Sequence, residues 1–313
     1  MRRHTTASSW HWIVAVVVVG LLLEGHPLRS CGCHAWSSRR TWLIKAPVGA
    51  ALTYVYGRGF SNVLQNVGLK HPAAHEERVQ STIAKTLQAA GHHPNTQQRH
   101  WNILEVGMGT ECRIIRRGLY RQGLQELQMA TTTITSNENS RRDIPSISLV
   151  GVDLQAPDDT TLNNARRILA QESDMQIDLS FLSHSITEPL PFDDGTFDAI
   201  ICCLTLCSVD DPAAAVQEMN RLLRPDGGTL GFVEHVAVNP DERDRLGFLE
   251  RQQVWLDPWQ QKVADNCHLH RYTQDTFQTY LTDCELLQQE RFVVDAMWPV
   301  SMQACGVYQK QKS

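Results

Sequence analysis

Short apolar runs alternate with helical segments between residues 101 and 236, and this alternation limits the possible folds more than any other feature. Five of the runs have the length and character of buried strands. They span residues 101–107, 147–153, 176–185, 197–206 and 229–236. Strands that alternate with helices at short spacing form a parallel sheet with helices on both faces. We therefore expect a ligand site at the carboxyl ends of these strands.

The segments between the strands have helical spacing of their apolar residues. The expected helices span residues 76–90, 112–127, 160–171 and 210–228. The last is the best marked, because Asp211 is a suitable cap and Pro212 suits a first turn. Two more strands are expected near residues 286–294 and 304–309. The sequence thus predicts a doubly wound α/β fold with a mostly parallel seven-stranded sheet.

The N-terminal residues differ in character from the rest of the chain. Arg2 and Arg3 precede an apolar run at residues 12–23, which has signal-peptide length and is short for a bilayer span. This run predicts membrane association as a signal or anchor with an endomembrane address. The stretch that follows contains no acidic residue from Gly25 to His75, which also fits a two-part address to an organelle such as a plastid.

These patterns divide the chain into three regions. Residues 1–56 are expected to be a targeting or anchor region, residues 57–100 a helical extension, and residues 101–313 the main domain. Within the main domain we expect a polar surface insertion near residues 130–146 and a lid-like segment over residues 240–275. The net charge of −5 and the lack of a long basic run argue against a nucleic-acid partner.

A glycine pair follows the first expected strand, in the stretch LEVGMGTE at residues 104–111. Gly107 and Gly109 alone also fit a tight turn with no ligand. Glu105 would repel a phosphate but suits a cofactor with a cationic amino group. Asp153 ends the second strand, where a carboxylate accepts ribose hydroxyls. Together these residues predict a nucleoside site, in which Glu111 replaces an expected third glycine.

Four pieces of sequence carry a resemblance to a known family: LEVGMGT, Asp153, PLPFDDGTFDAI and RLLRPDGG. Their combination resembles class I S-adenosylmethionine-dependent methyltransferases of the broad type 11 kind. The later stretches LCSVDD, FVEHV and RQQVWLDPWQQKVADNCHLHR are similar to the methyltransferase-like thiol S-methyltransferases. Those enzymes are membrane-associated through an N-terminal hydrophobic segment, so the resemblance agrees with the apolar run at residues 12–23.

The resemblance implies S-adenosyl-L-methionine as the cofactor and assigns roles to matched positions. The cofactor-binding residues it implies are Glu105, Gly107 and Gly109 for the methionine end, Asp153 for the ribose, Ser185 and Ile186 for the adenine, and Leu204 and Thr205 beside the reacting centre. Ile186 stands where many relatives carry an acid that bonds the adenine amine. Glu111 would crowd the turn if its position requires a positive φ. We expect these departures to weaken cofactor binding without abolishing it.

Methyl transfer to a thiol requires deprotonation of the acceptor, which a nearby histidine can assist. The catalytic candidates are His235 and the adjacent Glu234, with His268 as a second histidine on the substrate side. A buried imidazole bonded to a loop is the alternative for His235. The segment at residues 248–272 is rich in aromatic residues, so Trp255 is expected either in the apolar wall of a lid or in a packing helix.

The nine cysteines show no CxxC pair and no zinc-binding spacing, so no metal is expected, and Cys202, Cys203 and Cys207 are interpreted as core residues. A small-molecule acceptor is the expected partner, and a thiol is preferred. Alternatives are O- or C-methylation of a quinone, phenol or sterol, and a catalytically silent binding module. A nicotinamide oxidoreductase is disfavoured because Cys112 stands where its turn requires glycine.

Overall fold

The computed structural model describes residues 71–91, 100–133 and 145–311, which all belong to one compact unit, Leu69–Ser313. The targeting region at residues 1–56 and its apolar run at 12–23 lie outside these ranges. Most of the expected polar insertion, residues 134–144, also lies outside them. Within the described ranges, no helix combines the length and the apolar character that crossing a membrane requires.

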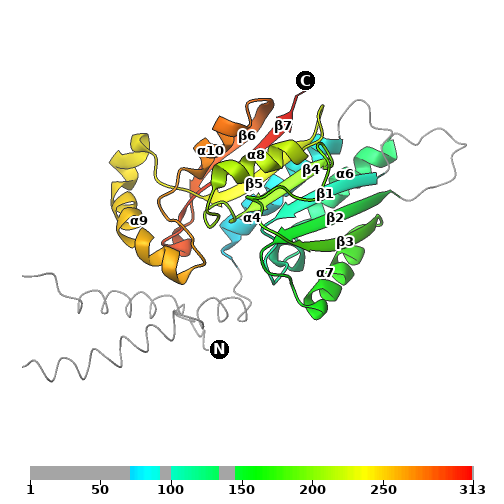
Figure 1. Cartoon of the computed structure of the whole chain (residues 1–313), viewed down its shortest axis with the longest axis horizontal. Coiled ribbons are helices and arrows are strands. Elements are labelled where there is room, and N and C mark those ends of the chain that lie inside the picture. The colour runs from blue at the N-terminus through cyan, green and yellow to red at the C-terminus, as the bar shows by residue number, and fades with distance from the viewer. Residues whose placement is uncertain (1–70, 92–99, 134–144, 312–313) are drawn as a thin grey trace, which may run out of the picture. The chain divides into compact units, whose positions relative to one another are not determined.

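A single seven-stranded sheet forms the centre of the unit, in the order β3-β2-β1-β4-β5-β7-β6 (Figure 1). Its strands are β1 (His100–Val106), β2 (Ser146–Asp153), β3 (Gln176–Ser183), β4 (Ala199–Cys203), β5 (Thr229–His235), β6 (Cys284–Val293) and β7 (Met302–Lys310). The first five strands are parallel, and β7 runs antiparallel to both β5 and β6. The predicted fold class, a doubly wound and mostly parallel seven-stranded sheet, is confirmed.

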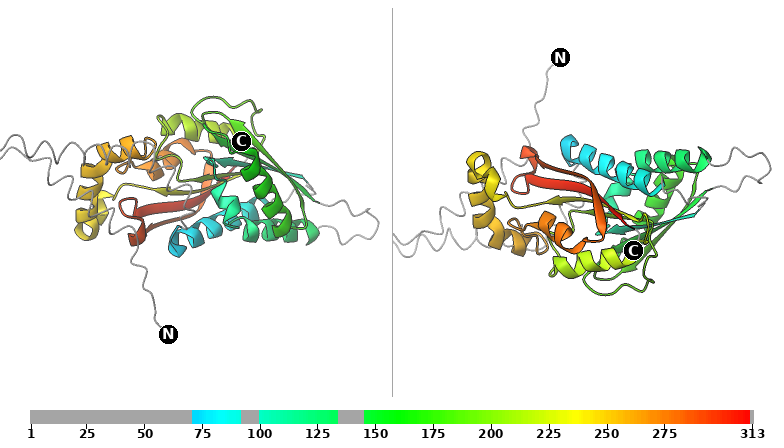
Figure 2. Two further views of the ribbon diagram at one scale, coloured as in Figure 1. Left: turned by 90° about the horizontal axis from the view of Figure 1, so that it is seen from below. Right: turned by 90° about the horizontal axis from the view of Figure 1, so that it is seen from above.

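Helices cover both faces of this sheet, as the two views of Figure 2 show. They are α4 (Ala73–Gly91), α5 (Arg113–Arg116), α6 (Arg121–Thr133), α7 (Asp159–Glu172), α8 (Pro212–Leu222), α9 (Arg243–Val263) and α10 (Thr273–Tyr280), with short 3-10 turns η2 (Pro240–Glu242) and η3 (Asp295–Met297). One apolar core lies between the sheet and helices α4, α5, α6 and α7. A second apolar core lies between the sheet and helices α8 and α10.

Helix α4 illustrates how the pattern in the sequence becomes packing. Four of its apolar residues recur at helical spacing, and all four are buried in the first apolar core: Val79, Ile83, Leu87 and Ala90. The helix expected in the N-terminal extension therefore packs directly on the sheet. Helix α8 begins as expected, because the side chain of Asp211 accepts a hydrogen bond from Ala214 N at 3.0 Å.

The helix expected over residues 112–127 is wrong as a single element. The structure divides it into α5 and α6, with Gly118 between them at φ +69°. A side chain at this position would be strained by the positive φ, and an added Cβ would also require Glu172 Oε1, 2.8 Å away, to move. Residues 130–133, which were assigned to the polar insertion, continue α6.

Two strands end earlier than the sequence suggested. The apolar run at residues 197–206 forms a strand only over β4, because Leu204 turns to φ +54° and leaves the sheet. Strand β3 ends at Ser183, two residues before the expected end. Both corrections fall at the carboxyl edge of the sheet, so they move Leu204, Thr205 and Ser185 from strands into loops.

Candidate active site

The site lies where the strand order reverses, between β1 and β4, the position that open α/β sheets use for ligands. Glu105 pairs in register with Gly151 of β2, and Asp153 lies two residues beyond Gly151. Since side chains alternate along a strand, Glu105 and Asp153 point to the same face of the sheet. The two carboxylates thus lie near one another at the ends of neighbouring parallel strands, and the Asp153 charge contributes to raising the pKa of Glu105.

The turn after β1 brings its backbone close to the Asp153 carboxylate. Gly107 has φ +75° and Gly109 has φ +68°, values that glycine adopts without strain. Asp153 Oδ2 accepts a hydrogen bond from Gly109 N at 2.9 Å, while Oδ1 has only a 3.4 Å contact with Gln155 N. A Cβ at Gly107 would lie 1.9 Å from Thr205 Oγ1, so the turn is in close contact with the loop after β4.

Glu111 does not crowd this turn. The positive φ of the region falls on Cys112, at 44°, instead of on the position of the missing glycine. The Glu111 side chain forms an ion pair with Arg116 of α5. A third glycine is therefore unnecessary at residue 111 in this fold.

Glu105 is a buried carboxyl with an incomplete set of partners. Its side chain is 1% exposed, and Tyr120 donates a hydrogen bond to Oε2 at 2.8 Å. No described residue hydrogen-bonds to Oε1. Burial raises the pKa of Glu105 to about 7, although the Tyr120 hydrogen bond and the nearby Arg113 act in the opposite direction. Sequence reasoning missed Tyr120 and Arg113, since no local pattern marks them as neighbours of Glu105.

Glu234 positions the loop after β4. Its Oε1 atom accepts hydrogen bonds from Thr205 N at 2.8 Å and from Leu206 N at 3.1 Å. The Thr205 hydroxyl in turn donates to Val106 O at 3.1 Å, which joins this loop to the end of β1. Glu234, expected as a catalytic residue, is thus placed to hold Leu204 and Thr205 beside the site.

The two residues expected at the adenine lie past the carboxyl end of β3. Ser185 exchanges a 2.7 Å hydrogen bond with the Thr187 hydroxyl, and His184 N donates to Asp153 O at 3.0 Å. Ile186 is buried in the second core, where it forms an apolar floor instead of a polar contact. The loop therefore starts at the same edge of the sheet as Asp153.

His235 ends β5 and is buried, with Nε2 3.0 Å from Cys267 Sγ. Its Nδ1 atom has no hydrogen-bond partner among the described residues. The imidazole is thus bonded to a side chain, not to the loop carbonyl considered as an alternative. Cys267 comes from the segment after α9, and nothing in its local sequence indicates this contact.

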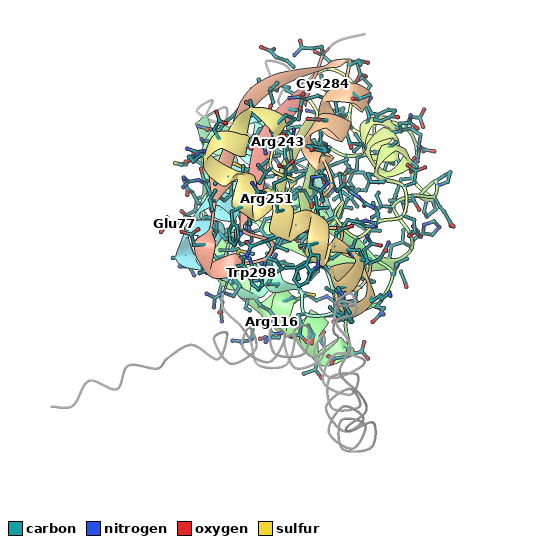
Figure 3. The ribbon with its side chains drawn as sticks, turned by 90° about the vertical axis from the view of Figure 1, so that its left-hand side faces the viewer. Glu77, Arg116, Arg243, Arg251, Cys284 and Trp298 are labelled. Atoms are coloured by element: carbon teal, nitrogen blue, oxygen red, sulfur yellow. The ribbon has the colours of Figure 1, made fainter. Side chains whose placement is uncertain are left out.

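The expected lid-like segment consists of η2, α9, a loop and α10. Figure 3 looks onto α9, where Arg243 and Arg251 are labelled. Phe248, Trp255 and Trp259 lie on its exposed side, and Trp255 is 58% exposed. Trp255 is therefore not the core residue of a packing helix. His268 is half-buried in the following loop, with Nδ1 3.9 Å from Asp257 Oδ2.

The strand order is that of the class I methyltransferase fold, with two carboxylates beside a glycine turn at the switch point. Residues 137–230 match the family model described as a methyltransferase domain. S-adenosylmethionine is the cofactor that this family implies.

The site residues fit this cofactor. The unpartnered, buried Oε1 of Glu105 suits a cationic amino group. At Gly109, an added Cβ would meet no described atom within 4 Å, so the backbone is open to a ligand there.

Among known proteins, the chain is similar to thiol S-methyltransferases. It is 44% identical over 80 residues to thiol S-methyltransferase TMT1B of Mus musculus, which covers 26% of this chain and 30% of that protein. The human TMT1A enzyme is 40% identical over 78 residues, or 25% of this chain and 30% of that protein. The matched region thus covers less than a third of the length of each of these relatives.

A longer match joins the chain to a demethylmenaquinone methyltransferase of Beutenbergia cavernae, 29% identical over 57% of this chain and 69% of that protein. Among solved structures, a methyltransferase from Methanosarcina mazei has a TM-score of 0.45 at 18% identity and covers 70% of this chain and 96% of its own. The CurJ carbon methyltransferase has a TM-score of 0.47 at 14% identity, over 99% of this chain and 72% of its own.

Proposed function

We propose that this protein transfers a methyl group from S-adenosylmethionine to a small, lipophilic acceptor, and that the acceptor atom is a thiol sulfur. One observation carries the proposal. Glu105 and Asp153 lie on the same face of the sheet at the ends of adjacent strands, and the bare backbone of Gly109 donates a hydrogen bond to Asp153. This arrangement suits a nucleoside that carries a cationic amino group at one end and a ribose at the other.

The side chains of the site bind and orient, and the cofactor, when bound, supplies a methyl group already activated on a sulfonium. Glu105 holds the amino end, and the Oδ1 atom of Asp153 faces the ribose hydroxyls. The loop of Leu204 and Thr205, fixed by Glu234, borders the reacting centre and limits the approach of the acceptor. Alignment and exclusion of water are the main contributions that such a reaction requires from a protein.

Two features support a lipophilic thiol as acceptor. The thiol S-methyltransferases to which this chain is similar act on thiols by their names, and the similarity includes a quarter of the chain. Helix α9 offers Phe248, Trp255 and Trp259 as an exposed aromatic surface at the edge of the domain. Membrane association through residues 12–23, with an endomembrane or plastid address, belongs to the same proposal because it would bring the enzyme to lipophilic acceptors.

C-methylation of a quinone is the second candidate. The demethylmenaquinone methyltransferase matches more than twice as many residues as the thiol S-methyltransferases do, although at lower identity. The two candidates differ in what they require of the acceptor, since a thiol needs deprotonation at sulfur and a quinone nucleus needs an activated ring carbon.

Two measurements test the proposal with the full chain. Calorimetric titration with S-adenosylhomocysteine is expected to show saturable binding, and titration with NAD is expected to show none. Methylation assays over a panel of thiols, phenols and quinones are expected to turn over lipophilic thiols. Turnover of quinones alone would replace the thiol by the second candidate, and binding of neither nucleotide would support a silent module.

A further inference from the structure

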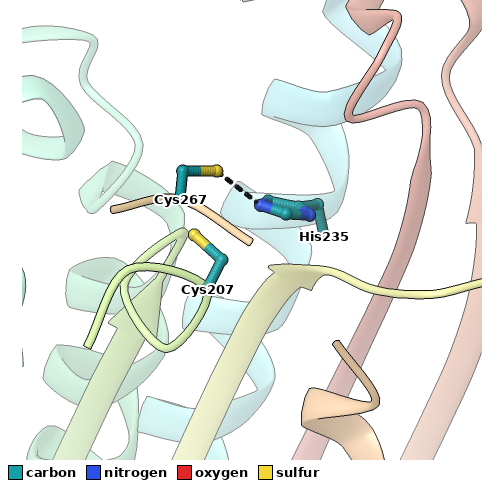
Figure 4. Close-up of side chains that lie close together, drawn as sticks. All are labelled: Cys207, His235 and Cys267. Atoms are coloured by element: carbon teal, nitrogen blue, oxygen red, sulfur yellow. Dashed lines mark hydrogen bonds between the residues drawn. The ribbon is translucent and has the colours of Figure 1, made fainter. Parts of the chain in front are cut away.

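Three potential metal ligands meet beside the proposed methyl-transfer site. Cys207, His235 and Cys267 each contribute one ligand atom, and the three atoms lie within 4.8 Å of one another. Figure 4 shows both sulfur atoms on the side of the His235 ring where Nε2 lies. The three residues are 3%, 2% and 8% exposed, respectively, so water reaches none of them freely.

The backbone holds these residues in place from three separate segments. His268 N donates to Cys207 O at 2.8 Å, which joins the two cysteine-bearing loops directly. Asn266 Nδ2 donates to Ser208 O at 3.0 Å. Ala237 N, two residues after His235, donates to Arg271 O at 2.9 Å. The ligand atoms are thus brought together by fixed loops, which is the preorganisation that a metal site requires.

We propose that Cys207, His235 and Cys267 bind a zinc ion. Two sulfurs and one imidazole form a ligand set that zinc prefers, and one that oxygen-binding magnesium and calcium do not share. Tetrahedral zinc with bonds of about 2.3 Å to sulfur and about 2.0 Å to nitrogen holds its ligand atoms roughly 3.5–3.8 Å apart. This spacing lies between two observed values. His235 Nε2 is 3.0 Å from Cys267 Sγ, and no two of the three ligand atoms are more than 4.8 Å apart.

The charges and protons balance in this site. Each cysteine loses its proton to solvent as a zinc–sulfur bond forms, so two thiolates neutralise the two positive charges of the ion. A neutral complex is the form that a buried environment tolerates best. The Nδ1 atom of His235 stays free to carry the ring proton, because Nε2 is the nitrogen that faces the sulfurs.

Three protein ligands leave one position of tetrahedral zinc for an exogenous ligand, as in catalytic zinc sites. The identity of this fourth ligand rests on the proposed function: it is the acceptor thiol. Its S–H proton would pass to solvent as the sulfur binds zinc, which would give the neutral three-ligand complex one net negative charge, and the bound thiolate would be the nucleophile that methylation requires. Cys207 follows Thr205 by two residues in the loop that Glu234 fixes, so the proposed metal position lies close to that loop.

The experiment loads the full chain with Zn²⁺ or Co²⁺ under reducing conditions and measures bound metal per chain. We expect one ion per chain, and for Co²⁺ the sulfur-to-metal charge-transfer absorption and intense visible bands of a tetrahedral thiolate site. Cys207→Ser, Cys267→Ser and His235→Gln should each weaken binding on the order of 100-fold or more. Cys305→Ser is the matched control, since Cys305 is equally buried but lies on β7.

Each outcome decides between alternatives. Absence of bound metal in the parent chain, equal loss in Cys305→Ser, or a Cys207–Cys267 disulfide found by mass spectrometry under the same conditions overturns the zinc site. Addition of an aliphatic thiol to the Co²⁺ protein should shift the visible bands, and unchanged bands overturn the acceptor's place on the metal. Calorimetry with S-adenosylhomocysteine is independent of the metal measurements, so failure of the proposed function is recognised separately.

Discussion

Glu234 accepts a hydrogen bond from the backbone N–H of Thr205 at 2.8 Å, and this contact joins the end of β5 to the loop after β4. The Glu234 side chain is fully buried, and the same oxygen also accepts from Leu206 N. A carboxylate that was expected to do chemistry is therefore the group that fixes the shape of the site.

Replacement of Glu234 by alanine leaves both of these N–H groups without an acceptor. Since each unsatisfied buried donor costs about 1–3 kcal/mol, we expect Glu234→Ala to lose about 2–4 kcal/mol of unfolding free energy and to weaken S-adenosylhomocysteine binding. Glu234→Gln retains an acceptor oxygen and should lose less of both. Urea unfolding and calorimetry check this, and equal losses in the two variants would contradict the role of Glu234 in fixing the loop.

Alanine substitution at the two turn glycines is expected to affect different properties of the protein, namely stability at Gly107 and cofactor affinity at Gly109. Gly107→Ala places a Cβ against Thr205 and should mainly destabilise the fold. Gly109→Ala costs about 1–2 kcal/mol for its positive φ, but its methyl group enters the ligand space and should reduce S-adenosylhomocysteine affinity by more than this. Gly247→Ala, in α9, is the control and should slightly stabilise the protein. Unchanged affinity in Gly109→Ala would move the cofactor away from this turn.

The pKa of Glu105, raised to about 7 from 4.5, predicts a dependence of stability on pH. Between these values the unfolded chain ionises while the folded carboxyl keeps its proton. The contribution of Glu105 to stability therefore falls as pH rises from 4.5 to 7, by about 3 kcal/mol, and stays low above 7. The difference in unfolding free energy between the parent protein and Glu105→Gln should show this fall, and a constant difference would contradict it.

The same group predicts proton release on cofactor binding. A cationic amino group beside Glu105 favours the carboxylate, so at pH 6 the binding of S-adenosylhomocysteine should expel a proton from this site. Calorimetry in two buffers of different ionisation enthalpy measures that release. Glu105→Gln should abolish it, and release that persists in this variant would assign the proton to another group.

Trp255→Ala tests the exposed side of α9 as a contact for the acceptor. Loss of one aromatic contact is worth about 1.4 kcal/mol, so the Michaelis constant of a lipophilic acceptor should rise about tenfold. The Michaelis constant of S-adenosylmethionine should stay unchanged. Met129→Ala removes a comparably exposed apolar side chain on α6 and serves as the control. Equal effects on both substrates would remove Trp255 from the acceptor site.

Sequence patterns were sufficient where the determinants are local or strictly periodic. The strand alternation and the cap at Asp211 predicted the sheet and α8, and the position of Asp153 at a strand end predicted its place beside the glycine turn. The break at Gly118 was missed because the apolar spacing continues through residue 118, while the left-handed backbone of this glycine interrupts the helix. The condition under which Glu111 would crowd the turn is not met, because the left-handed residue is its neighbour Cys112.

The contact between His235 and Cys267 was beyond sequence reasoning for the same physical reason. The two residues lie on different elements, and only the path of the chain through α9 and back to β5 brings them together. Spacing rules for metal ligands detect pairs on one turn or hairpin, and they do not detect ligands that three segments supply.

Strand β7 lies between β5 and β6 in the sheet, although it follows both in the chain. During synthesis, β5 therefore keeps one unpaired edge, and β6 has no partner, until residues 302–310 have emerged from the ribosome. An open edge of apolar strand is a template for association with other chains. Nascent or prematurely terminated chains of this protein are thus the forms most in need of chaperones, because the strand that closes the sheet is made last among its seven.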